Sequence, residues 1–159
     1  MAIDMFLKIN GIDGESKDKT HTDEIDVLAW SWGMSQSGTS HLGGGGGAGK
    51  VSVQDLSFTK YVDKASTALM KFCCDGGHID QCLLTVRKAG QTPLEYIKIT
   101  MDNVMVTSVS TGGSGGEDRI TENVTLNFAQ VTVDYMEQKP DGSGMAGGTL
   151  TWDIEANVE

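Results

Sequence analysis

Residues 110–128 read STGGSGGEDRITENVTLNF, a glycine-rich loop that leads into a strongly alternating segment. The apolar residues that share one face of this segment are Ile120, Val124, Leu126 and Phe128. The residues on the opposite face are Thr121, Asn123, Thr125 and Asn127. Alternation with a period of two predicts a β-strand with one buried face. Because the other face is polar but uncharged, we expect it to meet other chains or to line a wet cavity rather than a catalytic cleft.

The remaining sequence predicts a mainly β fold. Further strands are indicated over residues 2–10, 24–32, 51–58, 81–88, 94–109 and 149–154. The apolar phase changes between Val53 and Leu56, which suggests a bulge or bend. It changes again after Phe128, as expected of a strand that bulges round the corner of a barrel or sandwich.

One helix is predicted between these strands. Ser66 is a suitable N-cap, and Gly76 with Gly77 can end the helix. The apolar residues Ala65, Leu69, Phe72 and Cys73 recur at helical spacing. The sequence therefore predicts a two-sheet β-barrel with one flanking α-helix.

The predicted strand over residues 24–32 has tryptophans on one face. Alternation places Leu28, Trp30 and Trp32 together, and we expect this face to supply much of the core. The residues predicted on the other face are Ile25, Val27, Ala29 and Ser31.

Length and charge limit the classes of function. A chain of 159 residues has the size of one domain, so we expect a single domain over 1–159. A net charge of -10, with 12 Lys and Arg against 22 Asp and Glu, argues against nucleic-acid binding. The first residues contain neither a basic region nor a long apolar run, so we expect no signal peptide and no membrane span.

The cysteines and histidines suggest no metal site. The odd count of three cysteines, with Cys73 and Cys74 adjacent, predicts reduced thiols. Cys74-x3-His78-x3-Cys82 would place soft ligands close together, but a fourth ligand is missing and the spacing is not a common zinc pattern. We therefore expect these cysteines to behave as small apolar residues.

Two enzymatic alternatives also have little support. Gly44-x4-Gly49-Lys50 resembles a phosphate-binding loop, but Val51 stands where Ser or Thr should hold Mg²⁺, and a strand follows instead of a helix. His21 with Asp23 could belong to a hydrolase triad, but no nucleophile-elbow pattern is present. We expect His21 to be a surface residue, and we predict no catalytic residue and no cofactor.

Several motifs in order resemble the haemolysin-coregulated protein (Hcp) family, and the resemblance extends along essentially the whole chain. These motifs are Phe6-Leu7-Lys8-Ile9, Gly11-Ile12-x-Gly14-Glu15-Ser16-x-Asp18, His21, Glu24-Ile25-x-Val27, Trp30-Ser31-Trp32-Gly33, Phe58-Thr59-Lys60, Asp63-Lys64-x-Ser66 and residues 110–128. Thr67 departs from the proline that often follows the capping serine, which affects only helix initiation.

The resemblance implies a non-enzymatic subunit of the type VI secretion system. Hcp proteins form homohexameric rings of two-sheet β-barrels, which stack into an inner tube tipped by a VgrG-type spike protein and fired by a contractile sheath. The protein would be cytoplasmic before firing and would then be secreted with the tube. In part of the family the lumen also binds and stabilises small effector proteins.

Within such a ring, the small residues Ala29 and Ser31 are the candidates for contact with cargo in the lumen. The candidates for contact between stacked rings lie in loops and at the tail, and they are Gly43, Gly44, Gly45, Gly46, Gly47, Gly90, Glu155, Ala156 and Asn157. Two other classes remain open on the sequence alone. They are a monomeric β-barrel binding module and an enzyme with a concave site.

Overall fold

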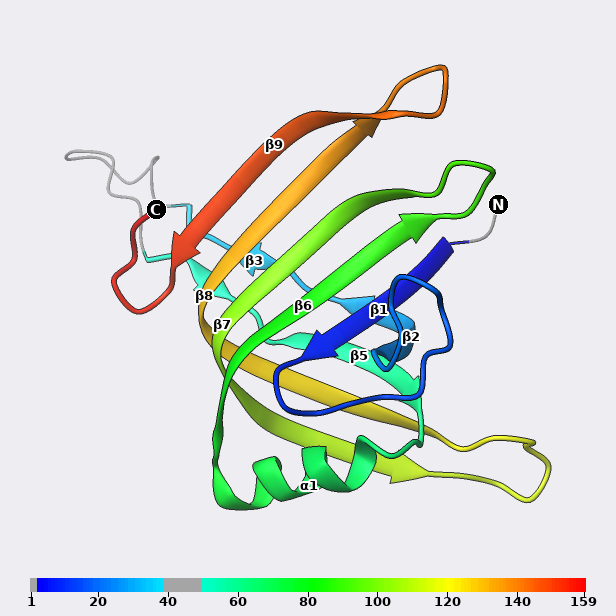
Figure 1. Cartoon of the computed structure of the whole chain (residues 1–159). Coiled ribbons are helices and arrows are strands. Elements are labelled where there is room, and N and C mark those ends of the chain that lie inside the picture. The colour runs from blue at the N-terminus through cyan, green and yellow to red at the C-terminus, as the bar shows by residue number, and fades with distance from the viewer. Residues whose placement is uncertain (1–2, 39–49) are drawn as a thin grey trace.

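An antiparallel sheet wraps round on itself in the computed structural model of the chain, which describes residues 3–38 and 50–159 (Figure 1). The elements are β1 (Ile3–Ile9), β2 (Ile25–Ser31), β3 (Met34–Ser35), β4 (Ser52–Val53), β5 (Leu56–Tyr61), α1 (Ser66–Asp75), β6 (His78–Lys88), β7 (Leu94–Gly112), β8 (Thr121–Gln138) and β9 (Gly144–Asp153). The strand order of the main sheet is β5-β2-β1-β6-β7-β8-β9, and a further pairing between β5 and β8 closes it. The predicted β-barrel with one flanking helix is confirmed.

The long strand β8 takes part in two different pairings. Its first half pairs with β5, from Tyr61↔Thr121 to Leu56↔Leu126, and its second half pairs with β9. Between the halves, the carbonyl of Ala129 accepts a hydrogen bond from the Ile154 N–H at 2.8 Å. Both β7 and β8 bend strongly on the way (Figure 1). The phase change after Phe128 therefore marks a barrel corner, as predicted.

The core lies inside this barrel and under the helix. Its fully buried members come from every strand of the closed part and from α1, and they include Leu7, Ile25, Leu56, Leu69, Leu84, Met101, Val104 and Leu126. Residues of β8 alternate as expected, because Val124 and Leu126 are buried whereas Asn123 and Asn127 are exposed. Ile120 lies outside the strand and is exposed.

The predicted faces of β2 are wrong in the first half of the strand. Ile25 and Val27 belong to the core, and the side chain of Leu28 is exposed. The reason is a bulge. Val27 pairs with Lys60 and Ala29 pairs with Thr59, so two steps along β2 correspond to only one step along β5. Beyond the bulge Trp30 packs against the core, and Ala29 and Ser31 are exposed.

The phase change between Val53 and Leu56 separates two strands. β4 ends at Val53 and β5 begins at Leu56, while the Gln54 N–H donates to the Gly33 carbonyl at 2.9 Å. The indole N–H of Trp32 donates to the Gln54 carbonyl at 2.8 Å. The predicted bend is thus the short connection between β4 and β5, and hydrogen bonds to Trp32 and Gly33 hold it in place.

The end of α1 was predicted correctly, but its start was not. Gly76 adopts a left-handed conformation at φ 67°, and its N–H donates to the Phe72 carbonyl. The N-cap is Ala65, and no side chain caps the helix. Ser66 is instead the first helical residue, and its hydroxyl donates to Glu122 Oε1 at 2.6 Å.

Ser66 belongs to a buried charged network that fastens α1 to the closing strands. Lys60 and Glu122 are cross-strand partners in the β5–β8 pairing, and their charged atoms lie 2.6 Å apart with both side chains fully buried. Lys60 Nζ also contacts Asp63 Oδ1 at 2.7 Å, and the Thr111 hydroxyl donates to Glu122 Oε2 at 3.1 Å. Burial alone would raise the pKa of Glu122, but hydrogen bonds from Lys60 and Ser66 outweigh it and lower the pKa.

We expect Glu122→Gln to lower the free energy of unfolding by about 3 kcal/mol or more, because Lys60 would lose its main partner inside the core. In the unaltered protein this contribution is present at neutral pH and is lost as the pH falls through the lowered pKa of Glu122. Urea-induced unfolding at a fixed protein concentration measures the loss.

Glu117→Gln is the matched control, since Glu117 is exposed in the loop before β8, and it should change stability by less than about 0.5 kcal/mol. Replacing both partners, Lys60→Met with Glu122→Leu, should recover part of the loss. Equal stability of Glu122→Gln and Glu117→Gln would contradict the importance of the buried pair.

Candidate functional site

A flat, uncharged surface runs across four neighbouring strands on the outside of the barrel. Cross-strand pairing aligns two rows of side chains on it. The first row is Ser31, Ser57, Thr125 and Ser108, and the second is Ala29, Thr59, Asn123 and Ser110. We call these eight residues the polar face. All of them are exposed or half-buried.

Side-chain hydrogen bonds within the polar face and at its border hold it in shape. The Thr59 hydroxyl donates to Asn123 Oδ1 at 2.6 Å. At the border, Asp55 accepts hydrogen bonds from the Asn127 amide at 2.8 Å and from the Thr107 hydroxyl at 3.1 Å. The surface therefore offers hydroxyl and amide groups, which both donate and accept, without a charged group among its eight members.

Both residues predicted for the lumen, Ala29 and Ser31, lie on the polar face. They line a shallow depression of about 230 Å³ together with Ser57, Thr59 and Asn123. The bulge at Leu28 turns them outward, so their exposure depends on a feature that strict alternation does not predict. Sequence reasoning did not identify the β5 and β7 members, because only the pairing register shows that they are neighbours.

The residues predicted for ring stacking fall into three groups. Gly90 lies in the exposed turn between β6 and β7, and Glu155, Ala156 and Asn157 are exposed after β9. These two groups lie at opposite ends of the sheet (Figure 1). Gly43, Gly44, Gly45, Gly46 and Gly47 lie outside the described residues.

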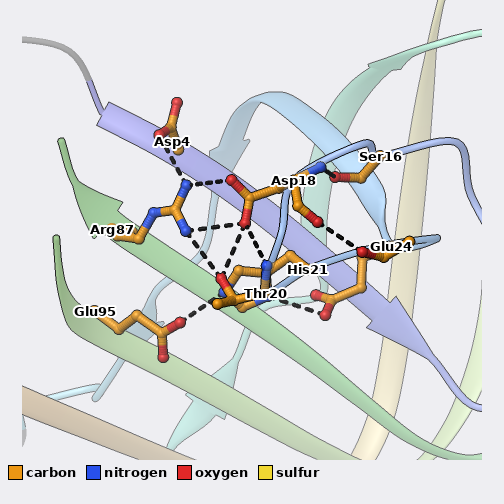
Figure 2. A network of polar contacts seen from close by, with 9 residues as sticks. Asp4, Ser16, Asp18, Thr20, His21, Glu24, Arg87 and Glu95 are labelled. Carbon is orange, nitrogen blue, oxygen red and sulfur yellow. Dashed lines mark hydrogen bonds and ion pairs between the residues drawn. The ribbon is translucent and has the colours of Figure 1, made fainter.

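A second polar cluster joins the loop over residues 10–24, called here the 10–24 loop, to β1, β6 and β7 (Figure 2). Arg87 Nη2 contacts Asp18 Oδ1 at 2.7 Å and Asp4 Oδ2 at 3.1 Å. The hydrogen bond between Arg87 and Asp18 lowers the pKa of the Asp18 carboxyl and raises that of the guanidinium. Arg87 Nη1 also donates to the Thr20 hydroxyl at 3.1 Å.

His21 belongs to this cluster, and its expected place on the surface is wrong. Only 8% of the residue is exposed, because its ring stacks on Phe6 at 4.4 Å between centroids. Its ring nitrogens face Glu24 and Glu95 rather than Asp23. Asp23 instead adopts a positive φ of 63° in the turn before β2.

The cysteines are placed differently from one another. Cys74 is exposed and Cys73 is half-buried, while Cys82 is fully buried in β6 and burial raises the pKa of its thiol to about 12. Over residues 3–38 and 50–159, His, Cys, Asp and Glu side chains form no group of three that could hold a metal ion. No helix in the same ranges is long and apolar enough to cross a membrane.

Comparison with known proteins places the whole architecture in one family. Residues 6–135 match the family model described as type VI secretion system effector, Hcp. Protein hcp1 of Pseudomonas aeruginosa is 65% identical, covering 100% of this chain and 99% of that protein. The crystal structure of Hcp1 from Salmonella typhimurium is similar with a TM-score of 0.78 at 42% identity, covering 99% of this chain and 98% of that one.

A crystal structure of a type VI secretion system effector from Yersinia pestis is also similar. It has a TM-score of 0.76 at 36% identity, and it covers 95% of this chain and 100% of that one. The family model covers most of the chain, and the relatives match along nearly their full lengths. The chain therefore belongs to the Hcp family of type VI secretion proteins.

Proposed function

We propose that the protein is the structural subunit of a type VI inner tube, forming homohexameric rings that stack head to tail with the polar face turned into the lumen. The observation that carries this proposal is the polar face itself. Eight exposed or half-buried positions on four strands carry no charge, in a chain with a net charge of -10. An ordinary solvated surface has charges of both signs interspersed.

The absence of charged side chains is better explained if the polar face lines a lumen than if it faces bulk solvent. Six copies of any charged group would face one another across a narrow channel, and their repulsion would oppose both ring closure and the entry of cargo. Hydroxyl and amide groups avoid this repulsion and can still hydrogen-bond to a passing protein. Small effector proteins are therefore the proposed cargo, with Ala29 and Ser31 at the contact.

The sheet also offers an edge for ring assembly. β9 is the last strand of the order, and in the described part of the chain its outer edge pairs with no other strand, apart from a bridge between Asp153 and Val158 at its end. Gly144, Gly147 and Gly148 lie in β9, and the exposed side chain of Met145 lies among them. An edge that meets a different patch on the next subunit makes a heterologous interface, which closes into a ring when the rotation allows.

The remaining partners follow from this role. The proposed tube would be tipped by a VgrG-type spike protein and surrounded by a contractile sheath. Its subunits would be cytoplasmic before firing and secreted with the tube. No nucleic acid, membrane span or cofactor enters this proposal, and stacking would use the rims that contain Gly90 and residues 155–157.

We expect the purified protein to be a hexameric ring without added nucleotide and in the presence of a chelator. Size-exclusion chromatography with light scattering gives the mass, and negative-stain microscopy shows the ring. Short tubes beside single rings are also expected, because head-to-tail stacking does not close. A clean monomer at micromolar concentration would contradict the proposed function.

We expect Ser31→Gln to leave the ring intact and to reduce retention of a co-expressed small effector by about tenfold or more. Six longer side chains would crowd the channel, and misfit in a packed contact costs about 1–3 kcal/mol. Co-purification of the effector with the ring measures retention.

Thr67→Gln is the matched control, because Thr67 is exposed on α1 and is not a member of the polar face. It should retain the effector as the unaltered ring does. Loss of the ring in Ser31→Gln would place Ser31 at a subunit interface, and undiminished retention would move the cargo contact elsewhere.

A further inference from the structure

Both ring nitrogens of His21 face carboxylates. Nδ1 lies 2.9 Å from Glu24 Oε2, and Nε2 lies 2.6 Å from Glu95 Oε1. An ionised carboxylate only accepts hydrogen bonds, and a neutral imidazole has one N–H. Only the imidazolium form can therefore donate to both partners at once.

Glu95 is suited to remain ionised in this contact. Burial would raise its pKa, but hydrogen bonds from His21 and Lys98 outweigh this effect and lower the pKa. Lys98 Nζ lies 3.2 Å from the other carboxylate oxygen of Glu95. A proton shared in the pair with His21 is thus best held by the imidazole.

The other groups around His21 have partners of their own. Phe6 of β1 stacks on the imidazole with an angle of 9° between the rings, and the electron-rich face of an aromatic ring favours a cation. The Arg87 guanidinium lies 5.0 Å from the centre of the Phe6 ring. The charged groups joined to the cluster by ion pairs are Asp18 and Glu24 from the loop, Asp4 from β1, Arg87 from β6, and Glu95 and Lys98 from β7. The charge of Arg87 is offset by Asp4 and Asp18.

The contact with Glu95 connects the loop to the base of a rim turn. Arg87 of β6 and Glu95 of β7 are cross-strand partners, and only the pair Lys88↔Leu94 lies between them and the turn. This turn, between β6 and β7, contains Gly90. His21 is 74 residues away from Glu95 in the sequence. The cluster therefore fixes the 10–24 loop to both sides of this turn (Figure 2).

From this geometry we infer that His21 is a proton-dependent latch, which in its imidazolium form fastens the 10–24 loop to the β6–β7 turn and holds that rim in the shape that stacks. The stacking part of this inference rests on the proposed function. The latch is closed while the imidazole carries its proton, and one of its two carboxylate bonds is lost when that proton leaves.

Opening is a local change rather than unfolding. The bond between Arg87 and Asp18 and the backbone bonds within the loop do not involve the imidazole, and they remain when its proton is lost. Among the latter, the Gly14 N–H donates to the Asp23 carbonyl at 2.7 Å and the Ser16 N–H donates to the Glu24 carbonyl at 2.9 Å. The folded protein should thus exist with the latch closed or open.

Hydrogen exchange on the full, assembled chain tests the latch directly. Protection of residues 10–24 and 89–95, corrected for intrinsic exchange, should be about tenfold greater near pH 5.5 than near pH 8, since one charge-assisted hydrogen bond is lost. His21→Gln should abolish this difference, because an amide keeps its shape and charge at both pH values. Glu95→Gln, which removes the carboxylate and keeps the histidine, should reduce the difference as well.

His78→Gln is the matched control. His78 is exposed and pairs through Nδ1 with Asn103 Oδ1 at 2.9 Å, a neutral partner away from the loop. This variant should keep the full pH dependence. Equal protection of the unaltered chain at both pH values, or an unchanged difference in His21→Gln, would overturn the latch.

Negative-stain microscopy of the same samples separates the latch from the proposed function. Longer stacks near pH 5.5 than near pH 8, with His21→Gln insensitive to pH, would support the coupling of the latch to stacking. Rings that stack equally at both pH values while the loop changes its protection would overturn this coupling. A chain that forms no rings at either pH would contradict the proposed function, and hydrogen exchange would still decide the latch itself.

Discussion

The pairing between β5 and β8 determines most of the structure, because it turns an open sheet into a barrel. The buried pair Lys60 and Glu122 lies within this pairing as cross-strand partners. A slip of two residues, which keeps the same side chains on the inner face, would separate the two charges within the core, at a cost of several kcal/mol. The ion pair therefore specifies the register. The same register aligns Ser57 with Thr125 and Thr59 with Asn123, so the polar face depends on it too.

The sequence contained a signal for this pair, because each of the two charged residues falls on the apolar face of its strand. Glu122 has the same phase as Val124 and Leu126, and Lys60 has the same phase as Leu56 and Phe58. A lone charge on an apolar face indicates a buried partner of opposite charge on a neighbouring strand. The general fold, the barrel corner and the glycine that ends α1 followed from local patterns. The partner of Ser66 did not, because it lies 56 residues further along the chain.

In the candidate sites, too, some features that depend on neighbouring residues were predicted, whereas contacts between residues distant in the sequence were not. Exposure of Ala29 and Ser31 was predicted correctly, while the faces of the residues before Leu28 were reversed. A bulge adds one residue without any marked change in composition, so periodicity cannot locate it. For His21, the nearby Glu24 was visible in the sequence, but Glu95 comes from another strand and only the fold brings it close.

The two charged clusters differ in their access to water, and this difference gives them different roles. The side chains of Lys60 and Glu122 are fully buried near α1, so they exchange protons with solvent only when the barrel opens. In the other cluster, the side chains of His21 and Glu95 are 9% and 31% exposed, so solvent reaches this cluster while the barrel stays closed. α1 and the β6–β7 turn lie at opposite ends of β6 (Figure 1). In a head-to-tail stack, each junction joins one rim of a ring to the opposite rim of the next, so a proton at His21 would act on one side of every junction and leave the barrel closure unchanged.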